Sequence, residues 1–167
     1  MIESYGVIAI VLVFVGMMVV LYRFQAAVAD RTACGQNLKM LMEAMTLYSE
    51  DYDGHYPQQQ GWAKDLLPYV ENLGIYSCPA DKGAYRLHRK KIRSTDIPVS
   101  YWYLASSFGQ DDESSAPLVG DRMLPTLCGN HDDGGNVGYL DGHVSWWTSE
   151  QWGRMHLPTE QYDRKKR

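Results

Sequence analysis

The residues best equipped for chemistry lie between positions 131 and 143, where imidazole and carboxylate side chains alternate with glycines. His131, Asp132 and Asp133 precede a pair of glycines, and Asp141 and His143 follow a few residues later. Carboxylates are the ligands that calcium prefers, whereas histidine pairs suit zinc or copper. A metal site with ligands among His131, Asp132, Asp133 and Asp141 is therefore one hypothesis. The alternative, which we favour, is that no metal binds, that Asp141 serves a turn, and that His131 hydrogen-bonds to the backbone of a glycine-rich loop.

The spacing of the potential nucleophiles, acids and bases matches no catalytic motif. Gly-x-Ser-x-Gly, His-Glu-x-x-His and a phosphate-binding glycine loop are absent from the sequence. Catalysis would need a nucleophile with a base, or a metal with an open coordination position. We therefore expect a protein that is not an enzyme and has no cofactor, with calcium as the one ion left open.

Three cysteines, Cys34, Cys78 and Cys128, allow one disulfide and one leftover thiol. Cys78 and Cys128 each stand beside turn-forming residues, so a bridge between these two is the preferred pairing. No bridge at all comes next, and a bridge with Cys34 last. An alternative of equal weight is that all three cysteines are small buried hydrophobic residues.

The pattern of residues 2–53 predicts one uninterrupted helix with two different halves. We expect this helix to position much of the chemistry described above. Residues 5–22 carry no charge and are rich in Val, Ile, Leu and Met, and about 20 such residues cross a bilayer. Residues 1–22 are thus predicted to be the membrane half. Residues 23–53 are predicted to be amphipathic and to pack on a core, with Gly54 as a left-handed cap. Apolar residues spaced by three and four define the packed face: Cys34, Leu38, Leu41, Met45, Tyr48 and Tyr52.

Residues 54–158 are enough for one small globular head, and a polar basic tail follows at residues 159–167. Residues 99–103 alternate in the manner of a strand, and residues 118–124 are predicted to form a second one. Between them, residues 106–117 are acidic and rich in serine, which predicts a mobile surface loop. The expected fold class is α+β, with the long N-terminal helix packed on a small antiparallel sheet.

The clearest sheet signal is a hairpin near the C-terminus. Residues 136–140 and 143–147 are joined by Asp141-Gly142, a dipeptide that favours a tight type I′ turn because both positions tolerate positive φ. We expect one apolar face of this hairpin to pack against the long helix. That face would consist of Val137, Tyr139, Val144 and Trp146.

Charge gives information about partners and topology. The net charge is −4, and basic residues gather only at 86–93 and 164–167, so we expect no nucleic-acid partner. Arg23 and Arg31 follow the apolar stretch and nothing basic precedes it, which would leave the head in the cytoplasm under the positive-inside rule. A basic leader removed before residue 1 would reverse that orientation. Whether Met1 is the initiator is left open.

The N-terminal segment resembles a known signature. Ile2-Glu3 followed by Val7-Ile8-Ala9-Ile10 is similar to the start of type IV pilins and type II secretion pseudopilins. The resemblance implies a pilin-like fold in which Glu3 aligns each incoming subunit with its neighbour. The filament core and membrane segment would then include Val7, Ile8, Ile10, Val11, Leu12, Phe14 and Val15.

A second set of motifs narrows this resemblance. His131, nine intervening residues and Asp141-Gly142 are similar to the signature of the prepilin-type processing-associated H-X9-DG group, in which the role of the motif is unknown. Asn37-Leu38-Lys39 and Cys78-Pro79 occur in the same order as in that group. Some type II pseudopilins bind calcium in a C-terminal loop, which is what the resemblance implies about an ion.

The resemblance implies a structural subunit of a type IV pilus-like or type II secretion pseudopilus filament. The chain would sit in the inner membrane as a precursor and then, through pilus or secretion assembly machinery, join a helical homo-oligomer at the cell surface or in the periplasm. The alternative is a monomeric membrane-anchored extracytoplasmic module for binding or sensing. Two questions are left open: whether the filament is a long pilus or a short pseudopilus, and whether the chain is its major or a minor subunit.

Overall fold

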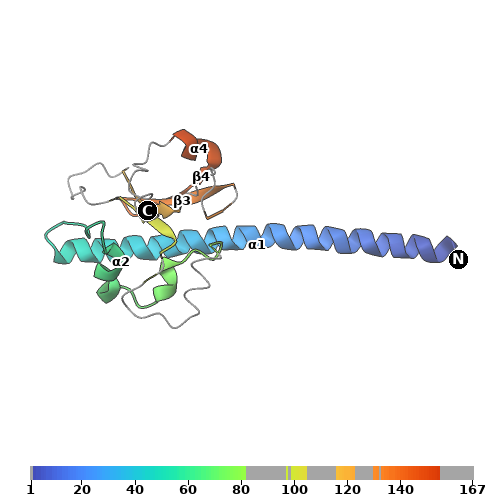
Figure 1. The fold of residues 1–167 in the computed structure, drawn as a ribbon, viewed down its shortest axis with the longest axis horizontal. Coiled ribbons are helices and arrows are strands. Elements are labelled where there is room, and N and C mark those ends of the chain that lie inside the picture. The colour runs from blue at the N-terminus through green and yellow to red at the C-terminus, as the bar shows by residue number, and fades with distance from the viewer. Residues whose placement is uncertain are drawn as a thin grey trace, which may run out of the picture.

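The computed structural model of the protein describes residues 2–81, 97, 99–104, 116–122, 130–131 and 133–154. One long helix runs out of a small head that contains a four-stranded antiparallel sheet (Figure 1). The predicted α+β layout, with a long N-terminal helix and a small antiparallel sheet, is thus confirmed. The tail at 159–167 and all but the last two residues of the predicted 106–117 loop lie outside the described residues.

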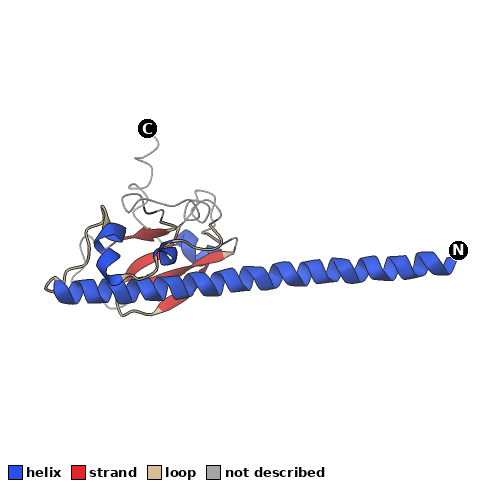
Figure 2. Cartoon of the chain, turned by 90° about the horizontal axis from the view of Figure 1, so that it is seen from below, coloured by secondary structure: helices blue, strands red, loops and turns tan. Residues whose placement is uncertain are grey.

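Helix α1 spans Ile2–Asp51 without a break. Its 50 residues contain no proline, and at 1.5 Å per residue they correspond to a rod of about 75 Å. The N-terminal half projects away from the head (Figure 2), and residues 5–29 are exposed. The helix is long and apolar enough to cross a membrane, because an 18-residue window in it reaches a mean hydropathy of 2.6 and is 0% buried.

The C-terminal half of α1 forms the centre of the head core. Cys34, Leu38, Leu41 and Met45 are each 0% exposed, which confirms the predicted apolar stripe. Tyr48 is partly buried against this core. The prediction was wrong for the last member, because Tyr52 lies beyond the final helical residue, where the backbone turns, and is 52% exposed.

A left-handed turn ends α1. Gly54 has φ 82°, as predicted, but Asp53 before it is also left-handed, with φ 53°. The Gly54 N–H donates to the Ser49 carbonyl at 2.7 Å, which is the six-to-one hydrogen bond of a Schellman cap with Asp53 at C′. The cap therefore starts one residue earlier than predicted.

A run of short helices between residues 62 and 77 packs on α1. It consists of α2 (Trp62–Asp65), η1 (Leu67–Tyr69) and η2 (Leu73–Tyr76), and in Figure 1 these elements lie on the other side of α1 from the sheet. The Asn37 amide donates to the Ser77 carbonyl at 3.0 Å, and the Tyr69 hydroxyl donates to Asp51 at 2.7 Å. These bonds tie the segment to both ends of the buried half of α1.

The sheet has the order β1-β2-β3-β4, and every neighbouring pair is antiparallel. Helix α4 (Ser149–Arg154) follows the last strand and lies on the side of the sheet away from α1 (Figure 1). The strand predicted at 99–103 is present in shortened form, and the one predicted at 118–124 begins one residue earlier and ends at Asp121. The strands span Tyr101–Tyr103 (β1), Pro117–Asp121 (β2), Gly134–Tyr139 (β3) and Val144–Thr148 (β4).

The face of β3 that meets α1 is not the predicted one. A Cβ atom added to Gly138 would lie 3.2 Å from the Met42 side chain, so Gly138 faces α1. Because side chains alternate along a strand, Val137 and Tyr139 face away from α1, where they pack with two tryptophans, Trp102 and Trp147. The placement of Val137 and Tyr139 against the helix was therefore wrong.

The reason is the close approach of α1 to β3, which leaves room only for small or flat side chains on the β3 side, such as Gly138 and Asn136. A Cβ on Gly35 would lie 3.2 Å from the Asn136 side chain, just as one on Gly138 would crowd Met42. On β4 the prediction holds for Trp146, whose ring lies 3.8 Å below the Arg31 guanidinium of α1. Val144 also packs against the core that α1 centres.

Replacement of Gly138 by Ala tests this close approach. The new methyl group would touch Met42 and Val119 at 3.2 Å, and overpacking of this kind costs about 1–3 kcal/mol. We expect the free energy of unfolding, followed by tryptophan fluorescence in denaturant, to fall by that amount. In a Met42→Ala background the same change should cost less, because the space is then vacated. Equal costs in the two backgrounds would contradict the proposed contact.

The hairpin between β3 and β4 is confirmed, but its turn is not type I′. Tyr139 N–H donates to the His143 carbonyl at 3.0 Å and Gly142 N–H donates to the Tyr139 carbonyl at 2.8 Å. Gly142 has φ 84°, whereas Asp141 has negative φ. The connection is therefore a three-residue loop, a type I turn closed by a left-handed glycine. The Asp141 carboxylate favours this turn because it accepts the His143 N–H at 3.0 Å.

Candidate functional site

Four side chains of metal-binding types meet where α1, the segment after η2 and the sheet come together. Their potential ligand atoms all lie within 4.8 Å of one another, and all four residues are buried. This set, hereafter the buried cluster, consists of Cys34, Cys78, Asp121 and His131.

Each member of the buried cluster comes from a different element. Cys34 lies on the buried stripe of α1, and Cys78 follows η2 at a turn in which Asp81 N–H donates to the Cys78 carbonyl at 3.0 Å. Asp121 is the last residue of β2, and His131 forms an isolated bridge with Gly134 at the start of β3. Residues far apart in the sequence are thus joined only through the tertiary fold.

Asp121 is the centre of the hydrogen bonding. Its side chain is 0% exposed. One carboxylate oxygen accepts from Cys34 Sγ at 2.8 Å and from Asn130 Nδ2 at 2.9 Å. The other accepts from the backbone N–H and Nδ2 of Asn136 at 2.6 and 3.1 Å. A buried carboxylate is costly unless its oxygens are paired, and here three neighbouring residues supply the partners.

His131 directs Nε2 into the cluster, 3.4 Å from Cys78 Sγ and 3.6 Å from the Asp121 carboxylate. The interaction with the neighbouring Cys34 thiol is the largest cause that lowers the pKa of Cys78, to about 7, assisted by His131 and opposed by burial. Burial also acts against the charged imidazole, but Cys78 and the Asp121 charge outweigh it and raise the pKa of His131. These shifts favour a thiolate on Cys78 beside an imidazolium on His131.

The pKa of Cys34 is shifted in the opposite direction to that of Cys78. Burial, reinforced by Cys78 and by the charge of Asp121, raises the pKa of the Cys34 thiol. The Tyr101 hydroxyl lies 3.4 Å from Cys34 Sγ and 3.4 Å from Asn37 Nδ2. Because an amide nitrogen can only donate, the Tyr101 oxygen accepts from Asn37 and its own proton is available to the Cys34 sulfur.

The ring of His131 is also held from outside the cluster. It makes an edge contact with the Trp146 ring at 5.4 Å between centroids, and Trp146 is in turn covered by Arg31 of α1. The side chain of His131 therefore contacts Cys78, Asp121 and Trp146. The expected hydrogen bond from His131 to the backbone of a glycine-rich loop stays a prediction, because residues 123–129 and 132 around it lie outside the described part of the chain.

The rest of the H-X9-DG motif lies elsewhere. Asp141 is exposed at the β3–β4 turn, where its carboxylate contacts His143 Nδ1 at 2.5 Å. Hydrogen bonds from the His143 backbone and side chain lower the pKa of Asp141. Asp141 thus serves the turn together with Gly142, as the hypothesis without a metal predicted.

Of the other candidate metal ligands of the sequence, the two that the structure describes, Asp133 and Asp141, do not belong to the buried cluster. Asp133 is exposed and its carbonyl accepts the Ser149 N–H at 3.2 Å, and Asp132 lies outside the described residues. Among the described residues, the buried cluster and the predicted set therefore share only His131. Within the described part of the chain, this is the one group of three or more such residues close enough to share an ion.

Sequence reasoning missed Asp121 altogether and treated Cys34 as a buried hydrophobic residue. Cys34 and Cys78 are both free and buried. Because Cys78 is a free thiol, the preferred Cys78–Cys128 disulfide is not formed in the structure; Cys128 itself lies outside the described residues. No local signal pointed to this set, because Cys34 lies within the predicted helix 2–53 and Asp121 within the predicted strand 118–124, and neither position shows that the two side chains converge.

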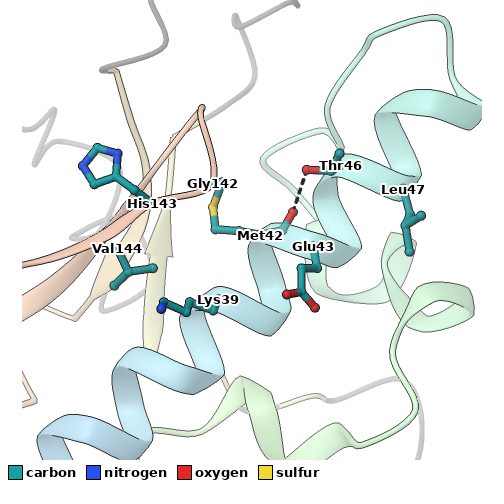
Figure 3. Close-up of a pocket in the computed structure, with 8 residues that line it drawn as sticks. All are labelled: Lys39, Met42, Glu43, Thr46, Leu47, Gly142, His143 and Val144. Atoms are coloured by element: carbon teal, nitrogen blue, oxygen red, sulfur yellow. Dashed lines mark hydrogen bonds between the residues drawn. The ribbon is translucent and has the colours of Figure 1, made fainter.

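A shallow surface groove lies between α1 and the β3–β4 turn (Figure 3). Met42 reaches from the helix toward the turn, and the Thr46 hydroxyl donates to the Met42 carbonyl at 3.0 Å. The groove brings no group of catalytic side chains together. Its lining consists of Lys39, Met42, Glu43, Thr46, Leu47, Gly142, His143 and Val144.

The fold defines a class of protein: a small α+β head on a helix that is long and apolar enough to cross a membrane. Comparison of the chain with protein families, with characterised proteins and with solved structures finds no match. Function must therefore be argued from the geometry of the helix and the head.

Proposed function

We propose that this protein is a structural subunit of a pilus-like or pseudopilus-like filament, which assembles through the apolar half of α1. The observation that supports this proposal most is the distribution of burial along one unbroken helix. Residues 5–29 are exposed, whereas the same helix has fully buried side chains from Cys34 to Met45. The head uses one half of α1 and leaves the other half without a partner among the described residues.

The exposed half is apolar around its whole circumference rather than along one stripe. The predicted filament-core residues are 53–65% exposed, namely Val7, Ile8, Ile10, Val11, Leu12, Phe14 and Val15. A helix that is apolar on every side must be surrounded, by lipid or by several other helices. One partner surface would leave part of it in water, at about 25 cal/mol for each Å² of exposed apolar area.

Lipid and sister subunits can cover this surface in turn. In the membrane, the helix stands in hydrocarbon, and in a filament it would lie among the same segments of neighbouring subunits. A subunit would then begin in the inner membrane, would be extracted by pilus or secretion assembly machinery, and would place its head on the outside of a periplasmic or surface filament. In this proposal Glu3 sets the register between neighbours, because a carboxylate beside hydrocarbon needs a charged partner.

Replacement of Glu3 by Ala tests the assembly step. We expect filaments to be lost from sheared surface material, as seen by electron microscopy, while the chain still fractionates with membranes. The matched control is Glu50→Ala, since Glu50 is an exposed glutamate in the part of α1 that belongs to the head. It should leave filaments unchanged.

The same experiment separates the filament from a monomeric membrane-anchored module for binding or sensing. A tethered module would retain its membrane attachment and its state of assembly in the Glu3→Ala variant. If the unaltered chain forms no filaments and stays a single copy in detergent and in cells, the filament proposal fails and the tethered module takes its place.

A further inference from the structure

We infer that the buried cluster is a structural binding site for one zinc ion, with Cys34, Cys78, Asp121 and His131 as its four ligands. The inference does not depend on filament assembly. It starts from the spacing of the ligand atoms, which all lie within 4.8 Å of one another. A tetrahedral zinc site with bonds of about 2.0–2.3 Å places its ligand atoms about 3.3–3.8 Å apart.

The individual distances are close to that arrangement. Cys78 Sγ lies 3.4 Å from His131 Nε2, and His131 Nε2 lies 3.6 Å from the Asp121 carboxylate. Cys34 Sγ lies 2.8 Å from Asp121 Oδ1, whereas His131 faces Oδ2, so the carboxylate would have to turn and to separate from the sulfur by several tenths of an ångström for one oxygen to bind the ion. An ion between these atoms would replace the contact between sulfur and carboxylate with two metal–ligand bonds.

The ligand types select the ion. Two sulfurs and one imidazole nitrogen are soft or intermediate ligands, which favour zinc over calcium or magnesium. Four protein ligands fill a tetrahedral shell and leave no open position, which is the pattern of a structural site rather than a catalytic one. All four residues are buried, so a bound ion would be shielded from water.

The surroundings have the character of an outer coordination shell, in which groups around a metal orient the ligands. Asn130 and both donors of Asn136 hold the Asp121 carboxylate in place. The Tyr101 hydroxyl can donate to Cys34 Sγ, as a hydrogen-bond donor to a zinc-bound thiolate does. Trp146 lies against the edge of the His131 ring and restricts its rotation.

Zinc at this position would connect the three parts of the head. Cys34 belongs to α1, Cys78 to the segment after the short helices, and Asp121 and His131 to the sheet. Because such a site is not preformed in the unfolded chain, the free energy of zinc binding would become free energy of folding. The ion would then hold the head to the helix that carries the apolar half.

The test uses the full chain in detergent, reduced and freed of metal, and then titrated with zinc chloride. We expect one zinc per chain by mass spectrometry under non-denaturing conditions, a rise in melting temperature, and protection of Cys34 and Cys78 from alkylation. Cobalt(II) in place of zinc should give the absorption of tetrahedral cobalt with sulfur-to-metal charge transfer. Cys34→Ser and Cys78→Ser should each remove that charge transfer or reduce it strongly.

Two further variants keep the test valid if the cysteine variants fail to fold. Tyr101→Phe removes only the hydroxyl near Cys34, and loss of such an outer-shell group weakens metal affinity by about 10–100-fold. His143→Gln removes an exposed histidine at the β3–β4 turn and should leave zinc affinity unchanged. The inference is overturned if the folded chain takes up no zinc, if Cys34 and Cys78 form a disulfide instead, or if Tyr101→Phe and His143→Gln weaken binding equally.

Discussion

Val15→Asp is expected to remove the protein from washed membranes and to abolish filaments. Val15 lies near the middle of the uncharged stretch 5–22 and is 54% exposed. An aspartate at the centre of a membrane helix costs about 2.5–3.5 kcal/mol, which corresponds to about a hundred-fold change in partition. In a filament the same carboxylate would stand among the apolar side chains of neighbours, where an unpaired charge is more costly still.

The control for this change is Met40→Asp, which introduces the same residue into the same helix. Met40 is 42% exposed but lies in the half of α1 that belongs to the head, so its environment is water in either state. We expect membrane fractionation and filament yield to stay at the level of the unaltered chain. Filaments of normal length from the Val15→Asp chain would show that the apolar half is not the assembly surface.

Asp121→Ala is expected to destabilise the head by about 3–5 kcal/mol, the cost of removal of one partner from a buried charged network. The change leaves the backbone and side-chain N–H groups of Asn136 without their carboxylate, together with the Asn130 amide and the His131 imidazole. Buried donors that lose their acceptor cost more than the hydrogen bond itself contributes.

The measurement is denaturant unfolding in the presence of a chelator, so that hydrogen bonding alone is compared and any bound metal is excluded. Asp141→Ala is the matched control, because this aspartate is exposed and serves only the β3–β4 turn. The Asp141→Ala change should shift the midpoint of denaturant unfolding far less than Asp121→Ala does. Equal shifts in the two variants would mean that the carboxylate at 121 does not organise the core.

Features that depend on local periodicity were predictable from the sequence. The stripe that includes Cys34 and Leu38 follows from spacing along a single helix, and no knowledge of its partner is needed. The hairpin follows from two short apolar runs around Asp141-Gly142. Its turn type was not predictable from the dipeptide, because the Asp141 side chain bonds to the His143 backbone and favours the longer loop.

Features that depend on how distant elements meet were not predictable. All residues of β3 from Gly134 to Tyr139 are buried, so the positions of apolar residues along this strand do not show which face meets the helix. The distance between α1 and β3 decides that face. The buried cluster has the same origin. Asp121 lies inside the predicted strand at 118–124, where no local pattern marks it as a site residue. The pairing of β2 with β3 brings it to Asn136, and the packing of α1 on the sheet brings it to Cys34.

The unbroken course of α1 has a consequence for any assembly held by its apolar half. An α-helix turns by about 100° for each residue, and α1 contains no proline between Tyr22 and Cys34. The number of residues between these two positions therefore determines the angle by which the head is rotated about the axis of a helix bundle. In such an assembly, the length of residues 23–33 would determine which side of the head points outward and which side meets the head of the next subunit.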